Sequence, residues 1–150
     1  MLLQINAQDW KTPSSQKNSW EMDIPSELDE QKRNILLISA ATTYTSALVA
    51  LNQLWYSDYP KSDFHFINDN KEWLQMDKMG HMTFSYYSGV AGIKACQWTG
   101  MSRKKSIWYG GFTGTSFLTI VEILDGKSAE WGASSGDLIA NSLGSFLAIG

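Results

Sequence analysis

Cysteine and charge are both scarce in this chain of 150 residues, and each shortage limits what the chain can do. A single cysteine, Cys96, excludes an intrachain disulfide and a cysteine-based zinc site, and its apolar surroundings predict a buried, inert thiol. Charged residues make up 18% of the chain, below the roughly 25% that is usual for soluble domains. The net charge is −3 and the one dense basic run is 103–105, so we expect no nucleic-acid partner.

Motifs for nucleotide binding or nucleophilic catalysis are also missing. Gly110, Gly111 and Gly114 lie inside an apolar helical segment, whereas a glycine-rich phosphate loop lies between a strand and a helix. No arrangement of residues fits a nucleophile with its base and orienting acid. We therefore expect no cofactor.

Tryptophan and long apolar runs are abundant instead. Aromatic residues make up 13% of the chain and include seven Trp, which suits protein interfaces and the headgroup layer of a membrane. Residues 34–57 contain no charge and are long enough to span the ~30 Å hydrocarbon core of a bilayer. Residues 1–8 resemble the end of a secretory signal peptide, and residues 9–25 are predicted to form a polar extended arm. Residues 26–150 are expected to form a single helical domain, and we expect the chain to continue past Gly150.

Apolar spacing and capping residues predict an all-α fold with four main helices that run alternately up and down. A capping box of Ser26 and Asp29 starts the first helix, and a box of Asp69 and Glu72 starts the second. Ser134 caps the last helix, and no strand pattern is recognisable. The four helices are expected within 26–57, 69–98, 102–124 and 134–150.

Small residues recur at helical spacing along the last three of these helices. Such stripes let helix backbones approach closely, as they do where the hydrophobic effect between helices is weak. They predict close Gly/Ala packing in a bundle. The residues assigned to this packing are Ser85, Gly89, Gly92, Gly110, Gly114, Gly136, Ala140, Gly144 and Ala148.

Ionisable and amide side chains gather near one end of each of the same three helices. Because neighbouring helices run in opposite directions, these ends should lie at one level and the side chains should converge into one pocket. Glu122 lies at the C-terminal end of its helix, where the helix dipole disfavours a negative charge, so it should have Lys78 or His81 as a cationic partner. The candidate site residues are Asp77, Lys78, His81, Glu122, Asp125, Asp137 and Asn141.

Three interpretations of this polar cluster remain open. Its members are simple helix caps and ion pairs, or they perform acid–base chemistry because crowding raises the pKa of one carboxyl group above that of another. In the third interpretation they bind a hard metal ion, and one His among carboxylates suits Mg²⁺, Ca²⁺ or Mn²⁺ better than Zn²⁺. We assign no metal at this stage.

Three segments carry a resemblance to a known family: WLQMDKMGH (73–81), KKSIWYGGFTG (104–114) and EILDGKSAEWGASSGDLIANSLG (122–144). They resemble the YfiM-type family of uncharacterised envelope proteins, which is in turn similar to VanZ-like membrane proteins. The shared pattern is an Asp-Lys-x-x-His start, a Glu on the next helix and an Asp-x-x-x-Asn-x-x-Gly helix. The resemblance implies a VanZ-like bundle in the cell envelope, on the periplasmic side of the outer membrane.

The sequence and the resemblance together predict two functions, of which the first is preferred. In that prediction the protein is a non-enzymatic accessory or scaffold subunit of an envelope complex, with membrane lipid and other envelope proteins as its partners. In the alternative it is an enzyme that acts on a lipid or lipid-linked envelope precursor through the Asp/His/Glu pocket. The resemblance implies no particular reaction.

Overall fold

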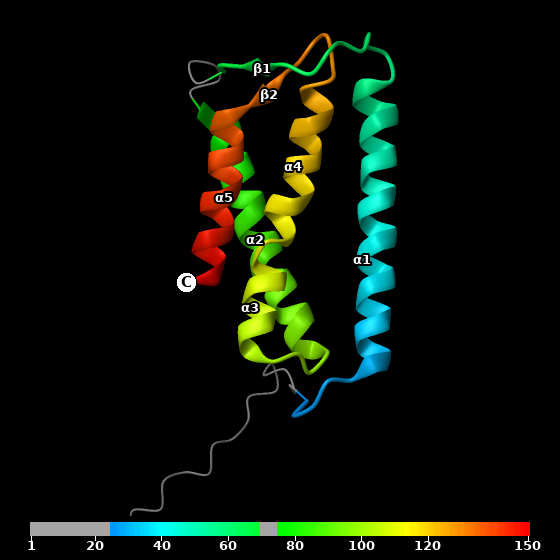
Figure 1. Ribbon diagram of the computed structural model, residues 1–150, viewed down its shortest axis with the longest axis vertical. Helices are drawn as coiled ribbons and strands as arrows, with labels where there is room; N and C mark the ends of the chain where they lie inside the picture. The colour runs from blue at the N-terminus through cyan, green and yellow to red at the C-terminus, as the bar shows by residue number, and fades with distance from the viewer. Residues whose placement is uncertain (1–24, 70–74) are drawn as a thin grey trace, which may run out of the picture.

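The computed structural model describes residues 25–69 and 75–150, and these residues form a bundle of helices with a short pair of strands across one end (Figure 1). The elements in chain order are α1 (Glu30–Leu51), η1 (Asn52–Tyr56), β1 (Phe66–Ile67), α2 (Met76–Trp98), α3 (Arg103–Gly111), α4 (Thr113–Asp125), β2 (Ala133–Ser134) and α5 (Ser135–Ile149). The expected all-α architecture is confirmed. The expected signal remnant and polar arm, 1–8 and 9–25, lie outside the described residues apart from the last residue of the arm.

The first helix starts three residues later than its sequence predicted. The cap is Asp29 rather than Ser26, because the Asp29 carboxylate accepts a hydrogen bond from the Lys32 backbone N–H at 3.0 Å. At its other end α1 continues into η1, a π-helical turn. Together they form a helix of 27 residues, Glu30–Tyr56, that is long and apolar enough to cross a membrane.

The second helix has a less regular start than expected. Gln75, which precedes α2, adopts the left-handed conformation with φ of 60°. Of the predicted capping box, Glu72 lies outside the described residues, and Asp69 has another partner, the hydroxyl of Ser134 at 2.8 Å. Gly100, with φ of +79°, follows the end of α2 as predicted.

The third predicted helix is broken at Phe112 into α3 and α4, so the prediction of one continuous helix was wrong. At the break, the Thr113 hydroxyl shares its proton between the Gly110 carbonyl at 2.8 Å and the Ser88 carbonyl at 2.9 Å. A continuous helix would use the Gly110 carbonyl to bond the N–H of Gly114. The two glycines at the end of α3 also favour a helix end there.

Two short strands were not anticipated. Phe66 pairs with Ala133 and Ile67 with Ser134 in a parallel arrangement, which joins the connection before α2 to the connection before α5. Two residues are too few to produce an alternating pattern in the sequence. The last helix does follow its prediction, because Ser134 caps α5 by accepting the Asp137 N–H at 3.2 Å.

Helices α2 to α5 pack against one another at the positions that glycine and other small residues occupy. The most extensive contact joins α2 to α5. A methyl group added at Gly144 would lie 2.2 Å from the Met82 carbonyl oxygen, and one at Gly114 would lie 2.6 Å from the Ser85 Cα. Gly89, Gly92, Gly110, Ala140 and Ala148 also lie in this packed region, whereas Gly136 is only half-buried.

The distribution of side chains is inverted relative to a soluble domain. In the part of the chain that the structure describes, the buried apolar side chains are Cys96, Leu118, Ala133 and Ala140. Buried polar ones are more numerous: Ser85, Thr99, Ser106, Glu122, Ser128, Ser134, Asp137, Asn141 and Ser145. Cys96 is 8% exposed and burial raises the pKa of its thiol, in line with the inert thiol predicted.

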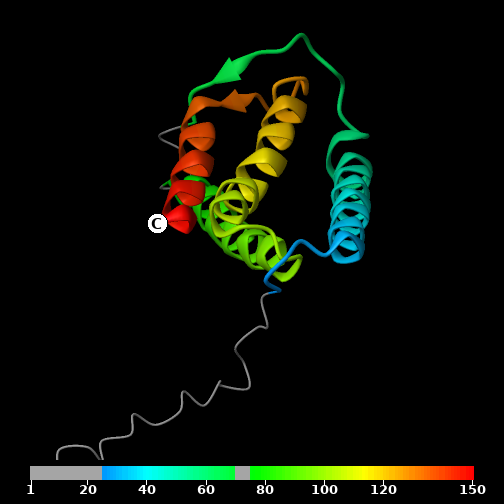
Figure 2. The ribbon, with the colours of Figure 1, turned by 60° about the horizontal axis from the view of Figure 1, so that its bottom comes forward.

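Helix α1 lies beside this bundle rather than within it (Figures 1 and 2), and none of its side chains is buried. Three hydrogen bonds tie it and its ends to the other helices. The Asp29 N–H donates to the Thr99 carbonyl at 2.8 Å, and the Tyr44 hydroxyl donates to the Thr113 carbonyl at 2.7 Å. The Tyr56 hydroxyl donates to the Asp125 carboxylate at 2.5 Å.

Candidate functional site

A cavity of about 610 Å³ with several carboxyl groups in its wall lies at the end of the bundle. The paired strands β1 and β2 are at the same end (Figure 1). The start of α2, the end of α4 and the start of α5 form the polar walls of this cavity, and η1 closes one side with aromatic rings. The structure brings all seven candidate residues to this end of the bundle. Five of them, Asp77, His81, Glu122, Asp125 and Asp137, line the cavity, and Lys78 and Asn141 bond to residues that line it.

Lys78 connects two carboxylates that come from different parts of the chain. Its ammonium nitrogen lies 2.8 Å from Asp69 Oδ1 and 3.4 Å from Asp137 Oδ1. All three side chains are largely buried, with 13%, 12% and 4% exposed. Burial raises the pKa of Asp69, but the bonds from Lys78 and Ser134 outweigh it, so the net pKa lies below its ordinary value. Lys78 is therefore a buried ion-pair partner of Asp69 and Asp137.

The Asp137 side chain is 4% exposed, and its burial affects its pKa more than any of its neighbours does. Burial is the largest influence on this carboxyl and raises its pKa, and nearby Asp77 raises it further. His81 and the hydroxyl of Ser134 act in the opposite direction without reversing the shift. The carboxyl is therefore harder to ionise than an ordinary aspartate.

Glu122 is 3% exposed and has two partners inside the cavity. Its Oε2 accepts the Ser134 backbone N–H at 2.8 Å, and its Oε1 lies 3.8 Å from His81 Nδ1. Burial raises the pKa of Glu122 to about 7, although the Ser134 N–H and His81 both lower it. Of the two cationic partners expected for Glu122, His81 is the one in contact.

His81 has a polar group at each ring nitrogen. Nδ1 lies 3.0 Å from the side-chain oxygen of Asn141, which is fully buried, and Nε2 lies 3.6 Å from Asp77 Oδ1. Asp77 and His81 are four residues apart on α2, so the helix itself holds them on one face. The Glu122 carboxyl, with a pKa of about 7, can exchange a proton with a bound molecule near neutral pH, and the His81 imidazole lies beside it.

The aromatic wall of the cavity was not predicted from the sequence. Trp131 lies edge-on to Tyr56 and Tyr59, with ring centroids 5.9 and 4.5 Å away, and at 5.8 Å from Trp55. Tyr56 also donates a hydrogen bond to Asp125, and burial raises the pKa of the Asp125 carboxyl. The sequence signal was the group of aromatic residues at 55–59, which follows the first helix, but nothing in the sequence pairs that group with Trp131.

We expect the protein to lose stability as pH rises from about 4.5 to about 7. Glu122 has an ordinary pKa of 4.5 and a folded-state pKa of about 7, so the folded protein binds a proton in this window that the unfolded chain releases. The stability that this proton contributes is complete below the lower value and is lost as pH passes the higher one. Asp125 and Asp137, whose pKa values are also raised, act in the same direction.

Thermal unfolding at several pH values, with Glu122→Gln beside the wild type, checks this expectation. The amide oxygen of Gln can still accept the Ser134 N–H but cannot titrate, so the slope should become shallower. Glu130→Gln is the matched control, because Glu130 is exposed. If the melting temperature of Glu122→Gln falls with pH as steeply as that of the wild type, a group other than Glu122 causes the pH dependence of stability.

A family model, DUF2279, described as a predicted periplasmic lipoprotein, matches residues 63–149. The match covers β1, the described part of the loop after it, and α2 to α5 as far as Ile149, and so includes every residue of the polar cluster. No curated protein and no solved structure matches the chain.

Proposed function

The chain belongs to this family of predicted periplasmic lipoproteins and is envelope-associated, and from that premise we propose a more specific role. We propose that it is a membrane-embedded accessory subunit of an envelope complex, and that its polar cavity receives the head group of a lipid or lipid-linked molecule. The resemblance of 73–81, 104–114 and 122–144 to VanZ-like membrane proteins supports this proposal. The observation that carries it is the inverted side-chain distribution.

Large apolar side chains cover the outside of the bundle, and small or polar ones fill the inside. On α1, Ile38 is 68% exposed, and on α5, Leu147 is 61% exposed. Exposing such an apolar surface to water costs about 25 cal/mol per Å² of apolar area, whereas exposing it to acyl chains does not carry this cost. The packing of small residues fits the same solvent, because helices in lipid associate through close backbone contact.

The two ends of the bundle differ in a way that suits the two sides of a lipid layer. The end with the α2–α3 connection carries basic residues: Lys32, Arg33, Arg103, Lys104 and Lys105. The cavity end carries the aromatic rings of Trp55, Tyr56, Tyr59 and Trp131, which are the residue types that gather in the headgroup layer. In this arrangement the cavity lies in the headgroup layer, outside the acyl-chain region, where a polar head group would reach it.

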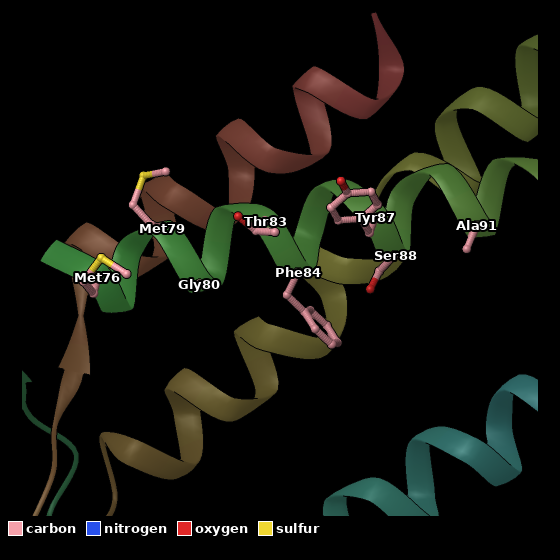
Figure 3. A pocket seen from close by; sticks show the side chains of 8 residues that line it. All are labelled: Met76, Met79, Gly80, Thr83, Phe84, Tyr87, Ser88 and Ala91. Carbon is pink, nitrogen blue, oxygen red and sulfur yellow. The ribbon is translucent and has the colours of Figure 1, made fainter.

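An apolar depression runs along α2 from the mouth of the cavity. Its volume is about 850 Å³ and it is lined by Met76, Met79, Gly80, Thr83, Phe84, Tyr87, Ser88 and Ala91 (Figure 3). Met76 also lines the polar cavity, so the two spaces adjoin. One amphiphilic molecule can therefore place its head group in the cavity and an acyl chain along α2, which supports a lipid or lipid-linked ligand.

We expect wild-type protein to stay with the membrane pellet after an alkaline carbonate wash, and Val49→Lys to be partly released. Val49 is 50% exposed and lies well inside the uncharged stretch, where a lysine costs about 2.5–3.5 kcal/mol. Gln53→Lys is the matched control: it lies on the same face one turn later, where the side chain can reach the headgroup layer. Release of the wild type itself by the wash would end the proposal of a membrane-embedded bundle.

A second candidate function, an enzyme acting on the same lipid-linked molecule, is favoured by the contact between Glu122 and His81. The two groups would donate and accept protons on a head group in the cavity. Glu122→Gln should then abolish complementation of a deletion strain while the protein remains abundant and still purifies with its lipid. A binding subunit would keep its function in that variant. Mass spectrometry of lipids and proteins recovered in mild detergent identifies the ligand and any partner subunit in the same experiment.

A further inference from the structure

The geometry points to a divalent-cation site in the polar cavity, formed by Asp77, His81 and Asp137. Each of these residues offers one ligand atom, and the three atoms all lie within 4.8 Å of one another. Nitrogen and oxygen ligands lie ~2.0–2.2 Å from a small divalent ion, so two ligands of one ion can be up to roughly 4.4 Å apart. The three ligand atoms therefore lie close to the spacing that one ion requires.

The hydrogen bond of His81 leaves the right nitrogen free to bind a metal. Asn141 Oδ1 can only accept, so His81 Nδ1 carries the proton and donates it across 3.0 Å. The other nitrogen, Nε2, then carries a lone pair and faces Asp77 Oδ1 at 3.6 Å. When the imidazole is neutral, two acceptors therefore face each other and a metal ion between them would satisfy both, whereas a doubly protonated His81 would satisfy Asp77 without a metal ion. Metal-binding histidines commonly have their other N–H held in this way by a buried oxygen.

The third ligand, Asp137, supplies a second and independent observation. Its side chain is 4% exposed and its Oδ1 accepts no hydrogen bond. The nearest cation is Lys78 at 3.4 Å, and that ammonium group is bonded more closely to Asp69, at 2.8 Å. Asp137 lines the cavity, and a buried carboxylate oxygen without a hydrogen bond is a group for which a metal ion would provide a partner.

The charges around the cavity also favour a cation. Its lining includes the carboxyl groups of Asp69, Asp77, Glu122, Asp125 and Asp137. The basic groups that contact these carboxyls, among the described residues, are Lys78 and His81. A bound divalent ion would offset this excess of negative charge. Two carboxylates with one imidazole suit Mn²⁺ better than Ca²⁺, which prefers an all-oxygen site.

The cation site does not depend on the proposed lipid ligand, but a bound cation would change which head groups the cavity can bind. Carboxylates alone repel a phosphate or carboxylate head group. With a cation held by Asp77, His81 and Asp137, the same cavity attracts an anionic oxygen to the remaining coordination positions.

The test uses the full chain in mild detergent, stripped with a chelator and titrated with Mn²⁺. Binding is followed by the loss of the free Mn²⁺ signal in electron paramagnetic resonance. We expect one Mn²⁺ per chain and a rise in melting temperature that a chelator reverses. Asp77→Asn should weaken the binding at least tenfold, and this variant should fold because the Asp77 side chain is 55% exposed.

Asp63→Asn is the matched control, because Asp63 is an exposed carboxylate in the loop before β1 and should bind Mn²⁺ like the wild type. His81→Gln, which removes the nitrogen ligand, should weaken binding as Asp77→Asn does. The inference is overturned if the wild type binds no Mn²⁺ up to about 1 mM, the range of the weakest extracellular cation sites. It is equally overturned if Asp77→Asn binds like the wild type, or if Asp63→Asn weakens the binding as much as Asp77→Asn does.

Discussion

Lys78→Met should lower the free energy of unfolding by about 3–5 kcal/mol, the usual cost of removing one partner from a buried ion pair. The loss arises because Asp69 and Asp137 would keep their buried positions without the ammonium group that lies between them. The apolar stem of Met replaces most of the volume of Lys, so the effect reports the lost charge rather than a cavity.

Chemical denaturation in mild detergent measures this difference. Lys127→Met is the matched control, because Lys127 is exposed and its loss should change stability by less than about 0.5 kcal/mol. The Lys78 variant should regain part of its stability as pH falls, because protonation of the two aspartates removes the uncompensated charges. Equal stabilities of the two lysine variants would mean that the Lys78 pair contributes nothing measurable.

Gly110→Ala should destabilise the bundle by about 1–3 kcal/mol, which is typical of overpacking. A Cβ at Gly110 would lie 2.3 Å from the Ile93 backbone nitrogen and 2.4 Å from the Gly92 carbonyl carbon. Both atoms belong to the backbone of α2, so they cannot move aside without separating α3 from α2. The substitution therefore acts on a close contact between the backbones of two helices rather than on a flexible side chain.

Gly80→Ala is the matched control, and we expect it to raise the stability of the bundle rather than lower it. Gly80 lies within α2, and a Cβ there would have no atom within 4 Å. Alanine reduces the freedom of the unfolded chain, so this variant should be more stable by about 0.4–1 kcal/mol. The measurement is the melting temperature of the two variants and the wild type. A Gly110→Ala variant more stable than the wild type would show that α2 and α3 do not pack as described.

The end of α2 before Gly100, the cap of α5 at Ser134 and the shared faces of the polar pairs could be predicted because each depends on neighbours in the chain. The spacing of Asp77 and His81 on one helix, and of Asp137 and Asn141 on another, fixed the face that each pair shares. Alternating helix direction then brought the pairs to one end. The small-residue stripes likewise showed which faces could approach closely.

Features that depend on distant parts of the chain could not be predicted. Asp69 was taken for a helix cap, and nothing local showed that it would bond to Lys78 and Ser134. Beside the break at Phe112, Thr113 bonds to Ser88, which is 25 residues away in the chain. The exposed position of α1 also depends on tertiary structure, because a buried helix and a lipid-facing helix have the same apolar composition.

The loose attachment of α1 has a mechanical consequence for the cavity. Most of the cavity wall comes from helices that are locked together through their backbones, but Trp55 and Tyr56 come from the end of a helix with no buried side chain. That end is joined to the rest of the cavity by the Tyr56–Asp125 hydrogen bond and by ring contacts with Trp131. A change in the tilt of α1 would therefore move one wall while the others stay in place. Tilt is how a long apolar helix adapts to bilayer thickness, so in the membrane-embedded arrangement that we propose, the width of the opening would be coupled to the thickness of the surrounding membrane.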